Sequence, residues 1–230
     1  MKEPQEALAQ PADTPNQLGK ALTIFFGHAS PRLLSLVLLG CIALRFYAGP
    51  FSTVDLLITA GIVLVWPMVE WLVHVHLLHF RPRRVLGVRI DPLNARRHRA
   101  HHRDPWRFER AFIPIPGLLL ALSKLMMMAA LSPWPASWSA VVTVLILGLH
   151  YEWVHYLAHI RYCPSWGPYR RLVRSHRLHH FKNETNWLGV SMTSGDVVMG
   201  TAPQPETVPR SPTVRDLHPE VLPAGALQLP

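Results

Sequence analysis

The stretch AVVTVLILGLHYEWVHYLAHI, residues 140–160, decides the fold. Its first half carries no charged side chain, and its length matches the roughly 20 residues that a helix needs to cross the hydrocarbon core of a bilayer. Near its end stand His155 and His159, which lie about 40° apart on one face of an α-helix. The stretch therefore predicts a membrane-spanning helix that presents two imidazoles together at one end.

Three further apolar runs predict three more spans. They are residues 33–51, 54–73 and 112–131, and Arg45 and Lys124 interrupt the first and the third. The composition agrees, since 49% of the 230 residues are hydrophobic and only 16% are charged, which is too apolar for an ordinary soluble domain. We therefore expect an all-α integral membrane bundle of about four transmembrane helices.

The formal charge of +9 is distributed unevenly along the chain. Ten arginines lie between Phe80 and Ala111 and further basic residues follow the last span, whereas the connections AGPFST (48–53) and SPWPAS (132–137) carry no lysine or arginine. Basic loops tend to stay on the cytoplasmic side of a membrane. We therefore expect a multi-pass protein whose histidine-rich loops and both termini face the cytoplasm. Because the arginines mark topology, we expect no nucleic-acid partner.

The two ends of the chain differ in composition from its middle. Residues 1–20 are largely polar and contain prolines, which predicts a flexible N-terminal segment. Residues 21–201 hold the spans and the histidines and form the predicted membrane domain. Residues 202–230 contain seven prolines and few groups able to build a core, which predicts an extended Pro-rich C-terminal tail.

Histidines recur in four groups next to the predicted spans. The groups are His74, His76 and His79; His98, His101 and His102; His155 and His159; and His176, His179 and His180. In each HxxHH group, the positions i, i+3 and i+4 fall within an arc of about 100° on one helical face. Two separate helices are therefore predicted to direct three imidazoles each toward one place, which forms a cytoplasmic histidine-rich cap.

The group at 74–79 does not fit a regular helix. His74 and His79 differ by about 140° around the axis, whereas His76 and His79 differ by about 60°. Geometry alone favours His76 as the partner of His79. If His74 is the ligand, either the helix distorts near its end or the two histidines serve different ions.

Clustered imidazoles predict a metal site. Neutral imidazole is a common ligand of iron, zinc, copper and nickel. Without a metal, ten partly protonated rings would repel one another beside the arginines. Ten rings exceed what one ion can use and suit two ions with about four or five nitrogens each. We therefore expect a di-metal site in the cap.

Zinc hydrolysis is the first rival to this interpretation. No HExxH motif occurs, and Glu70, four residues before His74, suits a hydrogen bond around a ligand better than the activation of water. Among the other histidines, we expect His28 and His218 to be surface residues and His150 to be satisfied within its helix.

The four histidine groups carry a resemblance. In order, they read HxxxxH (His74 and His79), HxxHH (His98, His101 and His102), HxxxH (His155 and His159) and HxxHH (His176, His179 and His180), with one membrane hairpin between the second and third. This pattern resembles the fatty acid hydroxylase and sterol desaturase superfamily, and the HxxxxH opening is similar to fatty acid 2-hydroxylases in particular. The stretches YEWVHYLAH and HHFKNETNWLGVSMTSGDVVMGT agree with it, and the resemblance covers residues 67–201. The chain departs from the family at Gly195, where tryptophan is common, and at Met199, where phenylalanine is common.

The resemblance implies a membrane-bound non-haem di-iron monooxygenase that hydroxylates a lipid C–H bond with O₂ and two electrons, on a fatty acyl chain. It implies that the ten histidines hold two iron ions, with zinc possible in a purified sample. The implied partners are a lipid substrate and an external electron donor of the cytochrome b5, ferredoxin or reductase type, because the segment before the first span is too short for a cytochrome b5 domain. The alternatives are a hydroxylase or desaturase of sterol-like or carotenoid-like lipids and, in a different class, a haem- or metal-binding electron carrier of the membrane.

Overall fold

The computed structural model describes residues 14–218 and is mostly helical. The elements are α1 (Leu18–Gly27), α2 (Ala29–Tyr47), α3 (Thr53–Val73), β1 (Arg83–Val85), β2 (Val88–Ile90), α4 (Leu93–Arg103), α5 (Ile115–Ala130), α6 (Ala136–Ala158), α7 (Gly167–Phe181) and α8 (Ser194–Met199). A π-helical turn, His74–Leu78, continues α3, and 3-10 turns lie at Phe108–Ala111 and Pro205–Thr207. Parts of the predicted terminal segments, residues 1–13 and 219–230, lie outside the described residues.

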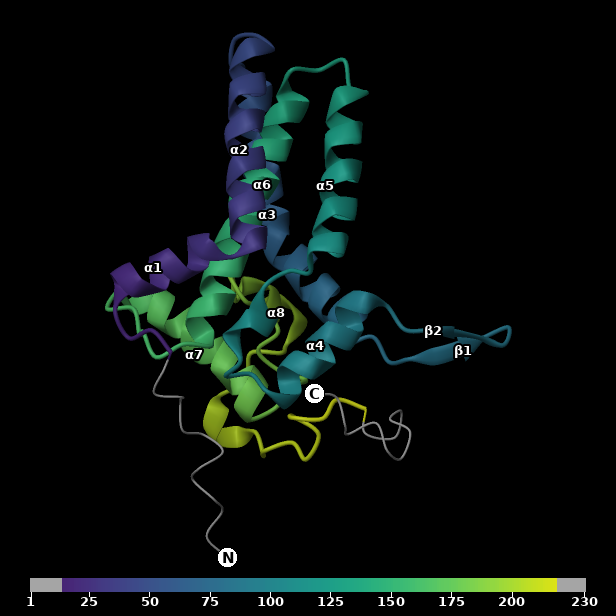
Figure 1. The fold of residues 1–230 in the computed structure, drawn as a ribbon, viewed down its shortest axis with the longest axis vertical. Coiled ribbons are helices and arrows are strands. Elements are labelled where there is room, and N and C mark those ends of the chain that lie inside the picture. The colour runs from purple at the N-terminus through teal and green to yellow at the C-terminus, as the bar shows by residue number, and fades with distance from the viewer. Residues whose placement is uncertain (1–13, 219–230) are drawn as a thin grey trace, which may run out of the picture.

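Four helices of the described chain are long and apolar enough to cross a membrane. These segments are Ala29–Tyr47, Thr53–Leu78, Phe108–Ala130 and Ala136–Ala158. They stand upright together in Figure 1, with α2 and α3 both packed on α6 and α5 beside them. The prediction of a helical membrane bundle with four spans is confirmed, and the protein is a multi-pass membrane protein. The side that faces the cytoplasm stays a prediction.

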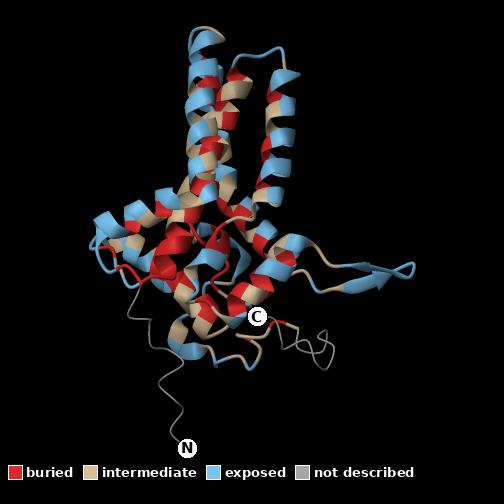
Figure 2. Ribbon diagram, in the orientation of Figure 1, coloured by how far each residue is buried: buried red, intermediate tan, exposed pale blue. Residues whose placement is uncertain are grey.

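The side chains on the outer faces of the spans are largely exposed. Leu64 is 80% exposed and Leu56 is 72% exposed, whereas Leu34 and Leu145 are buried between α2, α5 and α6. In Figure 2 the exposed colour follows the outer faces of the upright helices, and the buried colour concentrates where they join the cap below. This distribution fits helices whose outer leucines contact lipid tails.

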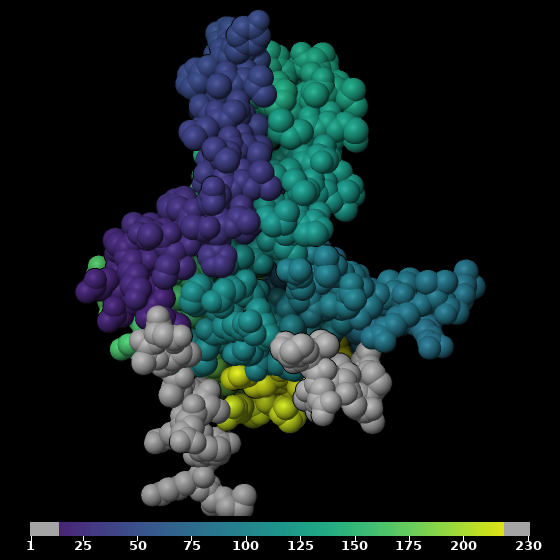
Figure 3. Space-filling view, viewed as in Figure 1, coloured from purple at the N-terminus to yellow at the C-terminus, as the bar shows by residue number. Residues whose placement is uncertain are grey.

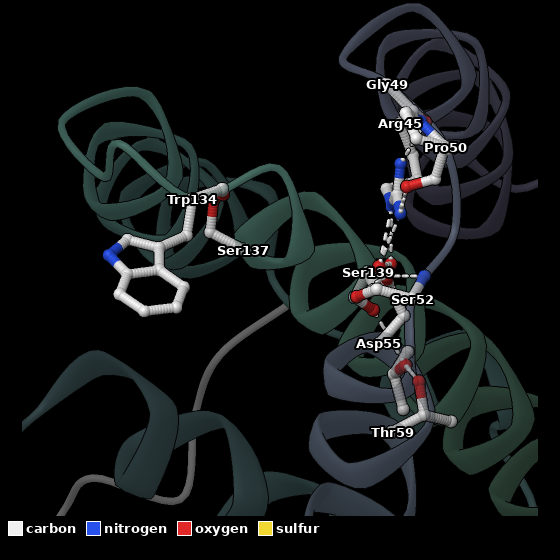
Figure 4. Close-up of polar contacts among 10 residues, drawn as sticks. Arg45, Gly49, Pro50, Ser52, Asp55, Thr59, Trp134, Ser137 and Ser139 are labelled. Atoms are coloured by element: carbon white, nitrogen blue, oxygen red, sulfur yellow. Dashed lines mark hydrogen bonds and ion pairs between the residues drawn. The ribbon is translucent and has the colours of Figure 1, made fainter.

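Arg45, which interrupts the first predicted span, is fully satisfied inside the bundle. Its Nε lies 2.8 Å from both Asp55 Oδ1 and Ser139 Oγ, and its Nη atoms donate to the carbonyls of Gly49 (2.9 Å) and Pro50 (3.1 Å) (Figure 4). A guanidinium has five donors in a planar fork, and these four acceptors surround it. Arg45 therefore joins α2, α3 and α6 at the end of the bundle that lies away from the cap.

The cap is built from α1, α4, α7, α8 and the lower ends of the spans (Figure 1). Its apolar core includes Phe25 of α1, Phe112, Tyr156 of α6 and Val173 of α7. Rings of Phe25 and Trp153 meet edge to face at 5.0 Å, a favourable aromatic geometry. Helix α1 thus lies across the base of the bundle with one face buried in the cap.

A β-hairpin projects from the cap (Figure 3), and the all-α prediction leaves it out. Arg83 lies opposite Ile90, and the two-residue turn at Leu86 and Gly87 has φ of 49° and 79°, as a type I′ turn requires. Its strands are three residues long and exposed on both sides, so no alternation of apolar and polar residues announces them.

Residues 203–218, the described part of the C-terminal segment, pack on the cap, which differs from the predicted extended tail. Val214 and Leu217 are buried, and the amide of Ser211 donates to the carbonyl of Lys182 at 2.8 Å. In Figure 3 the segment lies beneath the cap, on the side away from the spans. Composition alone missed this because two buried apolar side chains and a few backbone hydrogen bonds anchor the segment despite its prolines.

Replacing Arg45 with methionine is expected to lower the midpoint of thermal unfolding in detergent by several degrees. The variant keeps the volume but leaves the Asp55 carboxylate without its ion pair, and removing one partner of a buried pair is strongly destabilising. Arg84→Met in the exposed hairpin is the matched control and should leave the midpoint unchanged. Equal midpoints for the two variants would contradict the structural role of Arg45.

Candidate metal centre

Within the described residues, the ten predicted histidines gather in two groups of five. The first cluster consists of His74, His79, His98, His102 and His179, and the second cluster of His101, His155, His159, His176 and His180. In each cluster, one ring nitrogen from every histidine lies within 4.8 Å of the others. The clusters adjoin, since the ring centroids of His102 and His180 are 4.2 Å apart. The arrangement offers two neighbouring positions for a metal ion.

Helices α4 and α7 each supply both clusters. His98 and His102 of α4 face the first cluster, while His101, between them in sequence, faces the second. In α7 the assignment is reversed, because the pair at i and i+4, His176 and His180, belongs to the second cluster and His179 to the first. Each HxxHH helix therefore lies between the two positions. Its three histidines span about 100° of the helical face, and they point partly to one position and partly to the other.

The π-helical turn, His74–Leu78, brings His74 and His79 together. The amide of His79 donates to the carbonyl of His74, five residues earlier, at 2.9 Å, and the two rings lie 4.9 Å apart. A π-type turn inserts an extra residue and so changes the faces of the residues around it. This is the helix distortion that a ligand role of His74 requires. His76, favoured by regular geometry, is exposed and its ring lies near Trp71 instead.

The Nε2 atoms converge inside both clusters. In the first cluster, His98 Nε2 lies 3.2 Å from His74 Nε2 and 3.1 Å from His102 Nε2. In the second cluster, His101 Nε2 lies 3.1 Å from the Nε2 atoms of both His155 and His159. One hydrogen can serve only one such contact, so three nitrogens meeting in this way are not satisfied by one another.

Backbone carbonyls fix the tautomers of three rings in the first cluster. Nδ1 of His74 lies 2.5 Å from Leu188 O, Nδ1 of His179 lies 2.9 Å from Asn186 O, and Nδ1 of His102 lies 3.0 Å from Val214 O. A carbonyl can only accept, so each Nδ1 carries the hydrogen and each Nε2 offers its lone pair to the cluster centre. Lone pairs directed at one point suit a cation.

Burial keeps the cap histidines neutral. Desolvation holds the pKa of His98, His101 and His176 well below the usual value, and the neighbouring imidazoles lower it further. The pKa of His102 falls to about 3, also through burial, although its bond to the Val214 carbonyl raises it. A metal ligand must be the neutral ring, so the environment prepares these side chains to bind an ion.

Buried carboxylates support the loop that carries Leu188. Asp196 accepts from the amides of Leu188 (2.8 Å) and Gly189 (2.7 Å) and from Thr201 Oγ1 (2.7 Å). Glu70 accepts from the amide of Ser191 at 3.1 Å and from its hydroxyl. Glu70 was expected to hydrogen-bond to a ligand. Instead it bonds to Ser191, in the loop whose Leu188 carbonyl orients His74.

The position of Gly195 has no room for a side chain. A Cβ at this position would collide with the carbonyl of Pro67 in α3, and the side chain of Trp71 lies just beyond. Helix α8 therefore approaches α3 too closely for any side chain here. The close contact helps to position the segment before α8, which includes Leu188.

An apolar cavity of about 340 Å³ reaches both clusters. It lies between α3, α4, α5 and α6, and its lining includes Trp66, Leu118, Ala121, Gly148, His98 and His155. His98 belongs to the first cluster and His155 to the second. An apolar molecule in this cavity would therefore lie against both metal positions at once, in mainly apolar surroundings.

The remaining histidines lie outside the clusters. His28 stacks on Phe112 with ring centroids 3.9 Å apart, so it is a packing residue as well as a surface residue. His150 is half-buried and its ring meets Tyr169 edge to face at 5.6 Å. His218 was expected to be a plain surface residue, but its Nε2 lies 3.2 Å from the carbonyl of His79. The sequence gives no signal of that contact.

Comparisons with known proteins agree with the site. A family model described as fatty acid hydroxylase matches residues 59–201. The chain is 26% identical over 154 residues to a dihydroceramide fatty acyl 2-hydroxylase of Arabidopsis thaliana, covering 66% of this chain and 63% of that protein. It is 26% identical over 155 residues to a fatty acid 2-hydroxylase of Rattus norvegicus, covering 64% of this chain and 40% of that protein. The chain thus spans less than two thirds of either relative.

The fold is also similar to a solved structure. Full-length Scs7p, in which only the hydroxylase domain is visible, matches with a TM-score of 0.65 and 22% sequence identity. The match covers 81% of this chain and 69% of that chain. At this identity the likeness concerns the arrangement of the helices.

Alanine at His179 or at His101 is expected to weaken metal binding by at least the roughly 10- to 100-fold that is typical when even an outer partner of a ligand is lost. His179→Ala removes a nitrogen from the first cluster, and His101→Ala removes one from the second. Elemental analysis of purified protein measures the metal bound per chain. His76→Ala, an exposed histidine on the same turn as His74, is the control and should keep its metal. Full metal content in both cluster variants would reject the site.

Proposed function

Since the chain belongs to the fatty acid hydroxylase family, we propose that it is a membrane-bound di-iron monooxygenase that hydroxylates a C–H bond of a fatty acyl chain. The family resemblance inferred from the histidine spacing is confirmed by the family model. The proposal depends on one observation above all, which is that an apolar cavity among membrane helices touches two adjoining clusters of five histidines.

The donor set supports iron in both positions. Each cluster supplies five neutral nitrogens and no carboxylate, and imidazole suits iron as well as zinc, copper and nickel. Two iron ions held by these ten histidines would activate O₂, so that one oxygen atom enters the C–H bond and the other leaves as water with two electrons and two protons. The chain's own task is to hold the rings, position the acyl chain and keep bulk water away.

The cavity supports a lipid substrate. Its walls are mainly apolar side chains of α3, α5 and α6, the same helices whose outer faces fit lipid contact. Arg97, Arg110 and Asn94 line its cap end. An acyl chain could enter from the bilayer with its polar end near these side chains, which would limit the carbons that reach His98 and His155.

The electrons are proposed to come from an external protein of the cytochrome b5, ferredoxin or reductase type. Ten arginines lie between Phe80 and Ala111, in the hairpin, in α4 and next to them, and an acidic partner would complement those that are exposed. We also propose that this basic cap faces the cytoplasm, as the distribution of arginines around the spans indicates.

The first test compares lipid extracts of cells with and without the gene. We expect acyl lipids that have gained one oxygen atom, measured by mass spectrometry. A loss of two hydrogen atoms would instead identify a desaturase, and products among sterol-like or carotenoid-like lipids would identify the other substrate class. A purified protein with a strong Soret band and no non-haem metal would indicate the electron carrier and reject the proposal.

A second test fills the cavity. Gly148 lines it and has open space where a Cβ would stand, so Gly148→Leu should project into the cavity without disturbing α6. We expect at least about a tenfold loss of product with unchanged metal content, because the acyl chain is displaced from the reacting position. Gly61→Leu, in α3 and also with open space, is the control and should keep its activity. Equal activity in both variants would show that the substrate does not use the cavity.

A further inference from the structure

Residues 211–218, which we call the C-terminal strap, lie outside the part of the chain that the family model matches, yet they contact the metal centre. The strap crosses the face of the cap that lies away from the spans (Figures 1 and 3). Val214 is 2% exposed and Leu217 is 4% exposed. The strap is therefore packed into the cap along its length.

The strap touches the first cluster at two points. The carbonyl of Val214 accepts from His102 Nδ1 at 3.0 Å, and the ring of His218 contacts the carbonyl of His79 at 3.2 Å. Both histidines are members of the first cluster. The first contact decides which nitrogen of His102 carries the hydrogen, and the second holds the backbone at the end of the π-helical turn.

Several anchors hold the strap in this place. The hydroxyls of Ser211 and Thr213 both donate to Glu184 Oε1, which follows α7. Arg215 donates to the carbonyl of Arg103 at the end of α4 at 2.7 Å, and its guanidinium lies over the ring of Phe181. The strap is thus fixed to the ends of α4 and α7, the two helices that supply both clusters.

We propose that the C-terminal strap is a positioning element of the metal centre, which orients His102 and His79 and so holds the first metal position selectively. This inference rests on the proposed di-metal function. The other carbonyls that orient first-cluster rings, Leu188 and Asn186, belong to the matched family region. The strap adds a third carbonyl from outside it.

Selectivity between the clusters follows from these contacts. The strap acts on rings whose Nε2 atoms point into the first cluster, where His102 Nε2 lies 3.1 Å from His98 Nε2 and 3.2 Å from His179 Nε2. The backbone groups near His155 and His159 of the second cluster belong to Ala111 and Pro105, which lie outside the strap. Releasing the strap should therefore loosen one ion and leave the other in place.

The test uses the full-length protein loaded with iron in detergent and follows its release to a chelator. In the double variant Ser211→Ala/Thr213→Val, we expect one of the two ions to leave at least about tenfold faster than in the intact protein, the scale on which outer partners of ligands act, while the second leaves at the intact rate. Thr207→Val is the matched control, since Thr207 is exposed and, among the described residues, its hydroxyl bonds Gln204 in its own turn. It should release both ions as the intact protein does.

Two further variants complete the test. Glu184→Gln keeps an oxygen that can accept from both hydroxyls, so this single variant should release both ions as slowly as the intact protein does. A chain that ends at Arg210 lacks the strap, so His102 loses the Val214 carbonyl as its partner. This chain should bind about one ion instead of two. Unchanged release in the double variant, or equal acceleration of both ions, would overturn the inference. If the intact protein does not bind two ions, the proposed function fails instead, because that result precedes any change to the strap.

Discussion

Ten neutral imidazoles packed side by side, nine of them buried, are the constraint on which the rest of this structure depends. Carbonyls fix the hydrogen on Nδ1 of both His102 and His179, so the Nε2 lone pairs of these two rings face each other at 3.2 Å. Such contacts repel until a cation stands between them. The cap must hold the rings against this repulsion, and it does so with carbonyls of a loop and of the strap on their outer nitrogens, while buried carboxylates hold the loop.

Buried carboxylates connect the membrane helices at their ends and leave their middles apolar. Asp55 receives Arg45 and Ser139 at the end away from the cap. Glu152, at the cap end, accepts from the hydroxyl of Ser30 and the amide of Ile113, both at 2.7 Å, and so joins α6 to the starts of α2 and α5. In a bilayer, apolar contact between helices gains little over contact with lipid, so polar connections of this kind specify the arrangement.

The sequence could predict what depends on composition and local period. Apolar length predicted the four spans, and helical spacing predicted that His98, His101 and His102 face the metal centre together. The sequence could not predict that His101 belongs to the second cluster while His98 and His102 belong to the first, because that depends on where α6 and α7 lie. Nor could it place Val214, whose contribution is a backbone carbonyl that every residue type possesses. The π-helical turn lies between these cases, since regular geometry favoured His76, and a distortion was one of two alternatives if His74 is the ligand.

The metal centre has two sides with different partners, and different parts of the chain close them. On the membrane side, the cavity reaches His98 and His155 through walls that belong to the matched family region. On the opposite side, the strap reaches His102 and His79 from beyond that region. The side that meets the proposed substrate is thus built by the spans, whose geometry the bundle dictates. The side that faces water is closed by a segment anchored mainly to helix ends, so it can differ between relatives without altering the cavity.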